Sequence, residues 1–147
     1  MAKPRSVTVH NGEALKGALD ALDDIASESV LRQAAVAGAR VIHAEVKLRA
    51  PVYLGIYEGK QGAHPPGFLR SHIIIAYDDQ RSVPGRLASY LVTWSKEAYY
   101  GRFVEYGTSK MSANPFLRPG FEARKKAAAA AVGKVIQTKA GELTNGR

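Results

Sequence analysis

Apolar residues recur at steps of four and three between residues 28 and 49, which predicts a long amphipathic helix. Ser27 is the expected N-cap, and Pro51 ends the helix near Arg49 because the residue before a proline is disfavoured in the α conformation. One continuous apolar seam is expected on this helix, formed by Val30, Ala34, Ala37, Val41, Ala44 and Leu48.

A shorter helix is predicted ahead of the long one. Residues 12–22 follow Asn11, a favourable N-cap, and their leucines share one face of a helix. These leucines are Leu15, Leu19 and Leu22. Residues 6–10 alternate and are rich in β-branched side chains, which is typical of a short edge strand.

Two short apolar runs in the second half of the chain predict strands. Residues 73–77 and 89–95 are bounded by turn residues, and the connection between them carries Pro84 and Gly85. We therefore expect the two strands to pair antiparallel.

A last helix is predicted near the C-terminal end. It should start between Asn114, a suitable N-cap, and Pro119, whose fixed backbone suits a first helical turn. Its apolar pattern continues to about Lys139, and residues 140–147 are expected to form a fraying end.

Residues 51–67 have no apolar period and hold four glycines and three prolines, so we expect an extended loop insertion after the second helix. The length of 147 residues fits a single domain over residues 1–147. The element order predicts an α+β fold in which a small antiparallel sheet packs against the two longer helices.

The composition narrows the possible functions. The chain has no cysteine, which excludes a disulfide scaffold, a thiolate metal site and a cysteine nucleophile. Its net charge is +8, and from Gly101 onward nine Lys and Arg residues stand against three acids. Such a basic region suits nucleic acid, an acidic partner or a solvated helix surface. No stretch is apolar enough for a membrane helix, and no secretory signal is expected at the N-terminus.

The sequence carries no recognisable catalytic or cofactor-binding motif. The four histidines, at positions 10, 43, 64 and 72, fall in different segments and lack ligand-type spacing, so we expect no metal site. The sequence has no phosphate-binding glycine loop and no nucleophile elbow. We therefore expect neither an enzyme nor a cofactor.

Most of the aromatic residues gather in or beside residues 99–119, "YYGRFVEYGTSKMSANPFLRP". Tyr99, Phe103 and Tyr106 would share one face of a single helical turn, and Gly107 would end that turn. Glu105 points away from the rings and is expected to accept a hydrogen bond from the backbone or from nearby Arg102. A well-packed corner accounts for most of these residues.

This segment also resembles the signature of the tail-completion, or head–tail joining, family of long-tailed bacteriophages. The family pattern is a tyrosine, then Phe-Val-Glu-aromatic-Gly-Thr, a Lys-Met spacer and Pro-Phe-Leu-Arg-Pro before a last helix, which matches residues 99–119. A second match joins Ala50-Pro51-Val52 to Leu69-Arg70-Ser71-His72-Ile73. This chain lacks the usual Asp-Thr link and carries about a dozen inserted residues there, so the loop is the expected site of phage-specific contact.

The resemblance implies a structural virion protein of the neck or the head-proximal end of the tail, which passes through the host cytoplasm during assembly. It implies a ring, usually a hexamer, that contacts other neck or connector proteins and tail-tube or tail-terminator proteins, with no membrane partner. The candidate interface residues are Tyr57, His64, Phe103, Glu105, Tyr106, Thr108, Met111, Phe116 and Arg118. Candidates for non-specific contact with DNA in the channel are Arg124, Lys125, Lys126 and Lys134 of the last helix.

The alternative is a small basic DNA-binding or DNA-packaging accessory protein. The charge supports it, but the sequence shows no helix-turn-helix spacing, aromatic RNA-binding motif or zinc finger. A toxin or hydrolase is a remote third class, because no reactive constellation supports it.

Overall fold

The computed structural model describes residues 12–54, 57–59 and 62–145. Its helices and strands follow one another as α1 (Gly12–Ile25), α2 (Glu28–Arg49), β1 (Tyr57–Gly59), β2 (Gly62–His64), α3 (Phe68–Ser71), β3 (Ile73–Tyr77), β4 (Tyr90–Trp94), the 3₁₀ helix η1 (Lys96–Ala98), α4 (Gly101–Tyr106) and α5 (Leu117–Asn145). The predicted strand at residues 6–10 lies outside the described residues.

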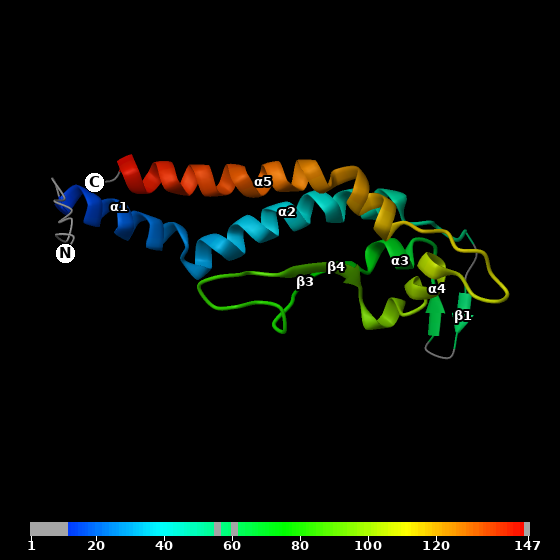
Figure 1. Cartoon of the computed structure of the whole chain (residues 1–147). Helices are drawn as coiled ribbons and strands as arrows, with labels where there is room; N and C mark the ends of the chain where they lie inside the picture. The colour runs from blue at the N-terminus through cyan, green and yellow to red at the C-terminus, as the bar shows by residue number, and fades with distance from the viewer. Residues whose placement is uncertain (1–11, 55–56, 60–61, 146–147) are drawn as a thin grey trace, which may run out of the picture.

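Helix α2 lies at the centre of the fold (Figure 1). Helix α5 runs along one side of it, and the β3–β4 hairpin packs on another side. Helix α1 packs against the C-terminal part of α5, whereas β1, β2 and α4 gather at the opposite end of the molecule (Figure 1). The α+β fold with a small antiparallel sheet packed against long helices is confirmed.

The β3–β4 pair confirms the predicted hairpin, with a register that runs from Ile73 opposite Trp94 to Tyr77 opposite Tyr90. A second hairpin, formed by two strands of three residues each, lies inside the predicted loop insertion, where β1 pairs with β2. The insertion therefore has local β structure that its irregular sequence pattern did not reveal.

The predicted seam of α2 is wrong in its C-terminal half. Val30 and Ala34 are buried, but Ala44 is exposed and 74% of Leu48 is exposed. Val46 is fully buried instead, and residues two apart on a helix point about 200° away from each other. The buried face of α2 rotates along the helix because its C-terminal half packs against the sheet and α3 as well as α5.

The core surrounds the C-terminal end of α2 and consists of Val46, Ala50, Leu69, Ile73, Ala98 and Phe116. The rings of Trp94 and Phe116 lie 6.2 Å apart within it. His43 Nε2 donates a hydrogen bond to the carbonyl oxygen of Ile73 at 2.8 Å, which links α2 to the start of β3. These contacts fix the sheet and the start of α5 on the same part of α2.

Helix α5 is longer than predicted, because it continues to Asn145 rather than ending near Lys139. Its close approach to α2 depends on Gly120, where a Cβ atom would lie 2.8 Å from Val46 Cγ2. In the part of the chain that the structure describes, no helix has the length and apolar character needed to cross a membrane.

Candidate assembly surface

The segment between α4 and α5 is a tight, hydrogen-bonded corner. Gly107 ends α4 with a φ of 75°, and its amide donates to the carbonyl oxygen of Phe103 at 2.8 Å. A Cβ atom at this position would lie 2.8 Å from the backbone nitrogen of Ala113. The amide of Thr108 donates to the carbonyl oxygen of Met111 at 2.8 Å and closes the next turn. Positive φ and lack of space both favour glycine here.

Glu105 joins this corner to α5. Its carboxylate accepts hydrogen bonds from the backbone amides of Phe116 at 2.8 Å, Leu117 at 2.9 Å and Arg118 at 3.0 Å. These amides lie at the start of α5. The first amides of a helix have no hydrogen-bond acceptor within the helix, and they lie at the positive end of the helix dipole. The prediction that Glu105 binds a backbone group is therefore confirmed, and Asn114 is not the side chain that caps α5.

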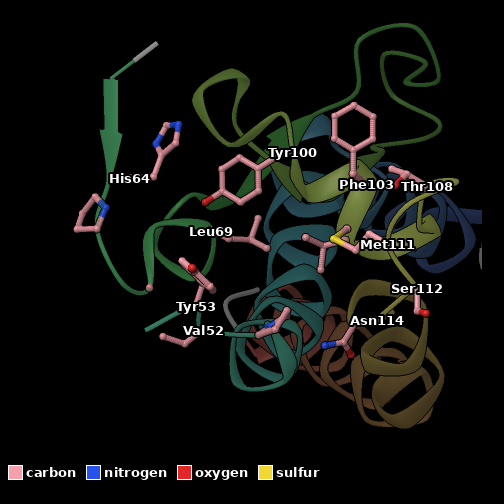
Figure 2. Close-up of a pocket in the computed structure, with 14 residues that line it drawn as sticks. Val52, Tyr53, His64, Leu69, Tyr100, Phe103, Thr108, Met111, Ser112 and Asn114 are labelled. Atoms are coloured by element: carbon pink, nitrogen blue, oxygen red, sulfur yellow. The ribbon is translucent and has the colours of Figure 1, made fainter. Parts of the chain in front are cut away.

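The corner and the loop insertion together enclose a pocket of about 650 Å³, which we call the corner pocket (Figure 2). In Figure 2 the side chain of His64 comes from the β2 side, and those of Phe103 and Met111 come from α4 and the following turn. The lining is mostly apolar and comprises Pro51, Val52, Tyr53, His64, Pro65, Gly67, Leu69, Tyr100, Phe103, Val104, Thr108, Met111, Ser112 and Asn114.

Aromatic rings support one wall of the corner pocket. The ring of His64 lies 4.3 Å from that of Phe68 and 5.4 Å from that of Tyr100. Burial raises the pKa of the Tyr100 hydroxyl, although a hydrogen bond with the backbone of Leu69 acts in the opposite direction. Tyr100 is therefore neutral at physiological pH and serves as packing in this wall.

A second concavity of about 720 Å³, which we call the helix groove, is lined by residues of α2, β4, α4 and α5. Its lining includes the small residues Ala35, Gly38 and Ala39 of α2. Leu91 of β4 lies on one side, and a stripe of α5 forms the other side. This stripe consists of Arg118, Phe121, Lys125, Ala128, Ala129 and Val132.

The predicted interface residues divide among three places. His64, Phe103, Thr108 and Met111 line the corner pocket, whereas Glu105, Tyr106 and Arg118 line the helix groove. Phe116 is fully buried and Glu105 is 5% exposed, so in the protomer these two side chains pack in its interior. The side chain of Tyr57 lies outside the described residues.

Sequence reasoning missed most of the corner pocket's other lining residues. Tyr53 is 71% exposed and lines the pocket next to the Ala50-Pro51-Val52 match. Tyr100 lies in the 99–119 segment, next to the predicted helical turn of Tyr99, Phe103 and Tyr106. Its orientation toward the pocket depends on contacts with α3 and β2, which lie more than 25 residues earlier in the sequence. No local pattern could place it there.

The four candidate DNA-facing residues do not form one basic face. Arg124 Nε donates to Glu45 of α2 at 2.9 Å, and Lys125 Nζ donates to Glu122 at 2.6 Å. Lys126 and Lys134 are exposed and form no ion pair within the described part of the chain. Because successive residues of a helix point about 100° apart, residues 124, 125 and 126 face three directions.

No group of three or more His, Asp or Glu side chains in the described ranges is arranged to hold a metal ion. Two of the histidines have structural partners instead. His43 bonds to the carbonyl oxygen of Ile73, and His72 Nδ1 donates to that of Phe68 at 2.8 Å.

Comparison with known proteins gives one match. Residues 13–107, more than half of the chain, match the model of the HK97-gp10-like family, which is described as "Bacteriophage HK97-gp10, putative tail-component". The matched range includes α2, the sheet, α4 and Gly107, and it ends before the turn at 108–111 and helix α5. Neither the curated proteins nor the solved structures that were searched gave a match.

Proposed function

Because this chain belongs to the HK97-gp10-like family of bacteriophage tail components, we propose that it is the tail-completion or head–tail joining protein of its phage. It is a structural protein of the virion tail, and its partners are other tail or neck proteins. In the proposed role it sits at the neck or the head-proximal end of the tail as a ring, usually hexameric in the family that the sequence resembles.

The corner pocket carries this proposal. It is open, mostly apolar and built from the corner at 99–119, in which the sequence resembles joining proteins, and from the loop insertion with its flanks, where Pro51, Val52 and Leu69 belong to the second match. Large apolar side chains at or beside its mouth are exposed to solvent, with 71% of Tyr53, 86% of Leu54 and 43% of Met111 accessible. Contiguous exposed apolar surface of this kind marks sites of protein–protein contact. The pocket is the surface that would accept a neck or tail protein.

A ring also agrees with the two separate concavities of the protomer. Head-to-tail contacts repeated around an axis use two different patches on each subunit and close without leaving an exposed patch. The corner pocket and the helix groove lie on different combinations of elements, so one can bind a copy of the chain while the other binds a different protein.

Charged substitutions in the corner pocket test the role. Tyr53→Asp and Phe103→Asp place a carboxylate on exposed or half-exposed apolar positions, so the protomer should fold but fail to complete particles. Leu87→Asp is the control, because Leu87 is 53% exposed in the β3–β4 connection and lines neither concavity. Plaque counts and electron microscopy of lysates give the result. Normal plaques from a folded Phe103→Asp variant would remove the corner pocket from the joining role.

Deletion of residues 55–64 tests the loop insertion in the same assay. The shortened protein is expected to fold and to leave particles incomplete. Because His64 packs against Phe68 and Tyr100, a second deletion of residues 57–62 keeps this ring in place and separates loss of the hairpin from loss of packing. Plaque formation by the folded short deletion would show that the hairpin makes no required contact.

The DNA-binding alternative rests on the net charge of +8 and on exposed Lys126 and Lys134. The distribution of charge around α5 argues against this alternative, because the lysines and arginines of the helix face several directions and form no continuous basic stripe for a duplex. In the proposed role, contact with DNA is limited to weak, sequence-independent attraction in the channel.

A further inference from the structure

Helix α1 carries an apolar stripe that the other described elements leave exposed. Leu15, Leu19 and Leu22 are 50%, 53% and 60% exposed, and their spacing of four and three places them on one face. The half-buried positions of the helix include Gly17 and Ala21, on a different face. Helix α1 therefore packs on α5 through small residues and presents its leucines outward.

The border of this stripe is acidic. Asp20 and Asp23 follow Leu19 and Leu22 directly in the sequence, on the side of α1 away from Ala18. Lys16 lies on the same side, so the border carries two acids and one cation there. Helix α1 as a whole has four acidic residues and one lysine, in a chain whose net charge is +8. The N-terminal helix is thus an amphipathic acidic element on a basic protein.

The helix groove has the complementary properties. Residues of α5 that line the groove recur at steps of three and four, so they form one straight stripe along the helix. These residues are Arg118, Phe121, Lys125, Ala128 and Val132. The stripe spans about 21 Å at 1.5 Å per residue, and a helix of the length of α1 spans about the same. Its apolar members Phe121, Ala128 and Val132 match the leucines, and its two cations, Arg118 and Lys125, match the acidic border.

We propose that α1 of one copy docks in the helix groove of the next copy and that this contact builds the ring. This inference rests on the ring of the proposed function, and it identifies the two surfaces through which neighbouring copies would touch. The leucines of α1 lie over Phe121, Leu91 and the small residues of α2, while Asp20 and Asp23 approach Lys125 and Arg118. The same chain's α1 is held at the far end of α5, so the groove is filled by a neighbour (Figure 1).

This contact is heterologous, because the stripe and the groove are different patches of the protomer. Each subunit gives its α1 to one neighbour and its groove to the other, and the contact closes into a ring. The corner pocket stays open in this arrangement and remains available to a neck or tail protein.

Cysteine cross-linking tests the docking cleanly, since the chain has no native cysteine. Phage tails carrying Leu19→Cys together with Ala129→Cys are treated with a short bismaleimide and run on a denaturing gel. The expected result is a ladder of covalent oligomers up to the copy number of the ring, because every subunit joins two neighbours.

The matched control pairs Leu19→Cys with Ala130→Cys. Ala130 is an exposed alanine next to Ala129, but it points about 100° further round α5 and does not line the groove. This pair should leave the protein as monomers. A second test pair, Asp23→Cys with Arg118→Cys, keeps all three leucines and should again give the ladder.

The outcomes separate the docking from the proposed function. If electron microscopy of untreated tails shows the ring but both test pairs give only the monomer band, the docking is wrong and the joining role stands. If the tails contain no ring of this protein, both are overturned. Equal ladders from the Ala129 and Ala130 pairs would also contradict the docking, because they would show that the reaction does not report the groove.

Discussion

Glu105 Oε2 lies 2.8 Å from the backbone nitrogen of Phe116, across eleven residues of chain. The carboxylate of α4 thereby supplies the cap that the first turn of α5 lacks, and Phe116 is fully buried in the core beside it. This side chain is one of the contacts that join the family-matched part of the chain to the long C-terminal helix, beside the packing of α5 on α2 and the Arg124–Glu45 ion pair.

Replacement of Glu105 by Ala should lower the free energy of unfolding by about 2 kcal/mol. Three backbone amides lose their shared acceptor, and loss of a helix cap or of a buried acceptor costs in this range. Glu105→Gln keeps one amide oxygen and should cost less. Urea unfolding followed by circular dichroism measures both.

Glu142→Gln is the control for that comparison, because Glu142 is exposed and bonds only to Lys139 in the described structure. Its effect should be within about 0.5 kcal/mol of zero. Equal stability of the Glu105→Ala variant and the unmodified protein would show that the cap does not hold α5 in place.

Two glycines of α5 should respond in opposite directions to alanine. Gly120→Ala should destabilise the protein by about 1–3 kcal/mol, because the new Cβ would lie 2.8 Å from Val46 Cγ2 and 3.2 Å from Val46 Cα. Gly133→Ala should stabilise it by about 0.5–1 kcal/mol, because nothing lies within 4 Å and alanine is the better helix former. Thermal unfolding of the two variants gives the comparison. The same sign for both would refute the close packing of α5 on α2.

The ion pairs of Glu45 predict a pH dependence. Hydrogen bonds from Arg124 Nε at 2.9 Å and Arg49 Nε at 2.7 Å lower the pKa of the Glu45 carboxyl below its ordinary value of 4.5. The stability that they contribute is present above that value and is lost as the pH falls through the lowered pKa.

Glu45→Gln should therefore lower the melting temperature at pH 7 and have a diminishing effect as the pH falls below 4.5. Because Arg124 belongs to α5 and both Glu45 and Arg49 to α2, the difference combines the contact between the two long helices with the pair inside α2. Melting curves of both proteins from pH 7 to pH 3 provide the measurement. A difference that grows on acidification would contradict the assignment.

Duplex DNA should bind the purified protein weakly. The cations of residues 124–126 face different directions, and two of them are engaged by Glu45 and Glu122. The dissociation constant at physiological salt should lie in the range of about 10⁻⁴ to 10⁻⁶ M that is typical of non-specific binding, and it should rise steeply with salt. Fluorescence anisotropy with a labelled duplex measures it. Nanomolar affinity at physiological salt would favour the DNA-binding alternative.

Periodic patterns in the sequence predicted the regular elements well. The helix over 28–49, the strand at 73–77 and the helical turn before Gly107 all lie where the pattern placed them, because local spacing and turn residues decide these features. The burial of Val46 in place of Leu48 was not predictable in the same way. It depends on which elements contact each face of α2, and this is tertiary information.

The site was predictable in its segments and not in its details. The insertion and the corner at 99–119 do meet around one pocket, yet Phe116 turned inward to the core and Glu105 turned toward the start of α5. Asn114 had the right side chain for a cap, but the carboxylate of Glu105 reaches three amides from a different element. Sequence spacing cannot show such a competition between a local and a distant acceptor.

Inactivation of the gene in the phage that encodes this protein tests the joining role most directly. A stop codon early in the gene, with the intact gene supplied in trans as the control, is followed by negative-stain electron microscopy of the lysate. The account predicts filled heads beside detached or over-long tails, with normal particles restored by the supplied gene. Intact, infectious particles from the stop-codon phage without the supplied gene would contradict it.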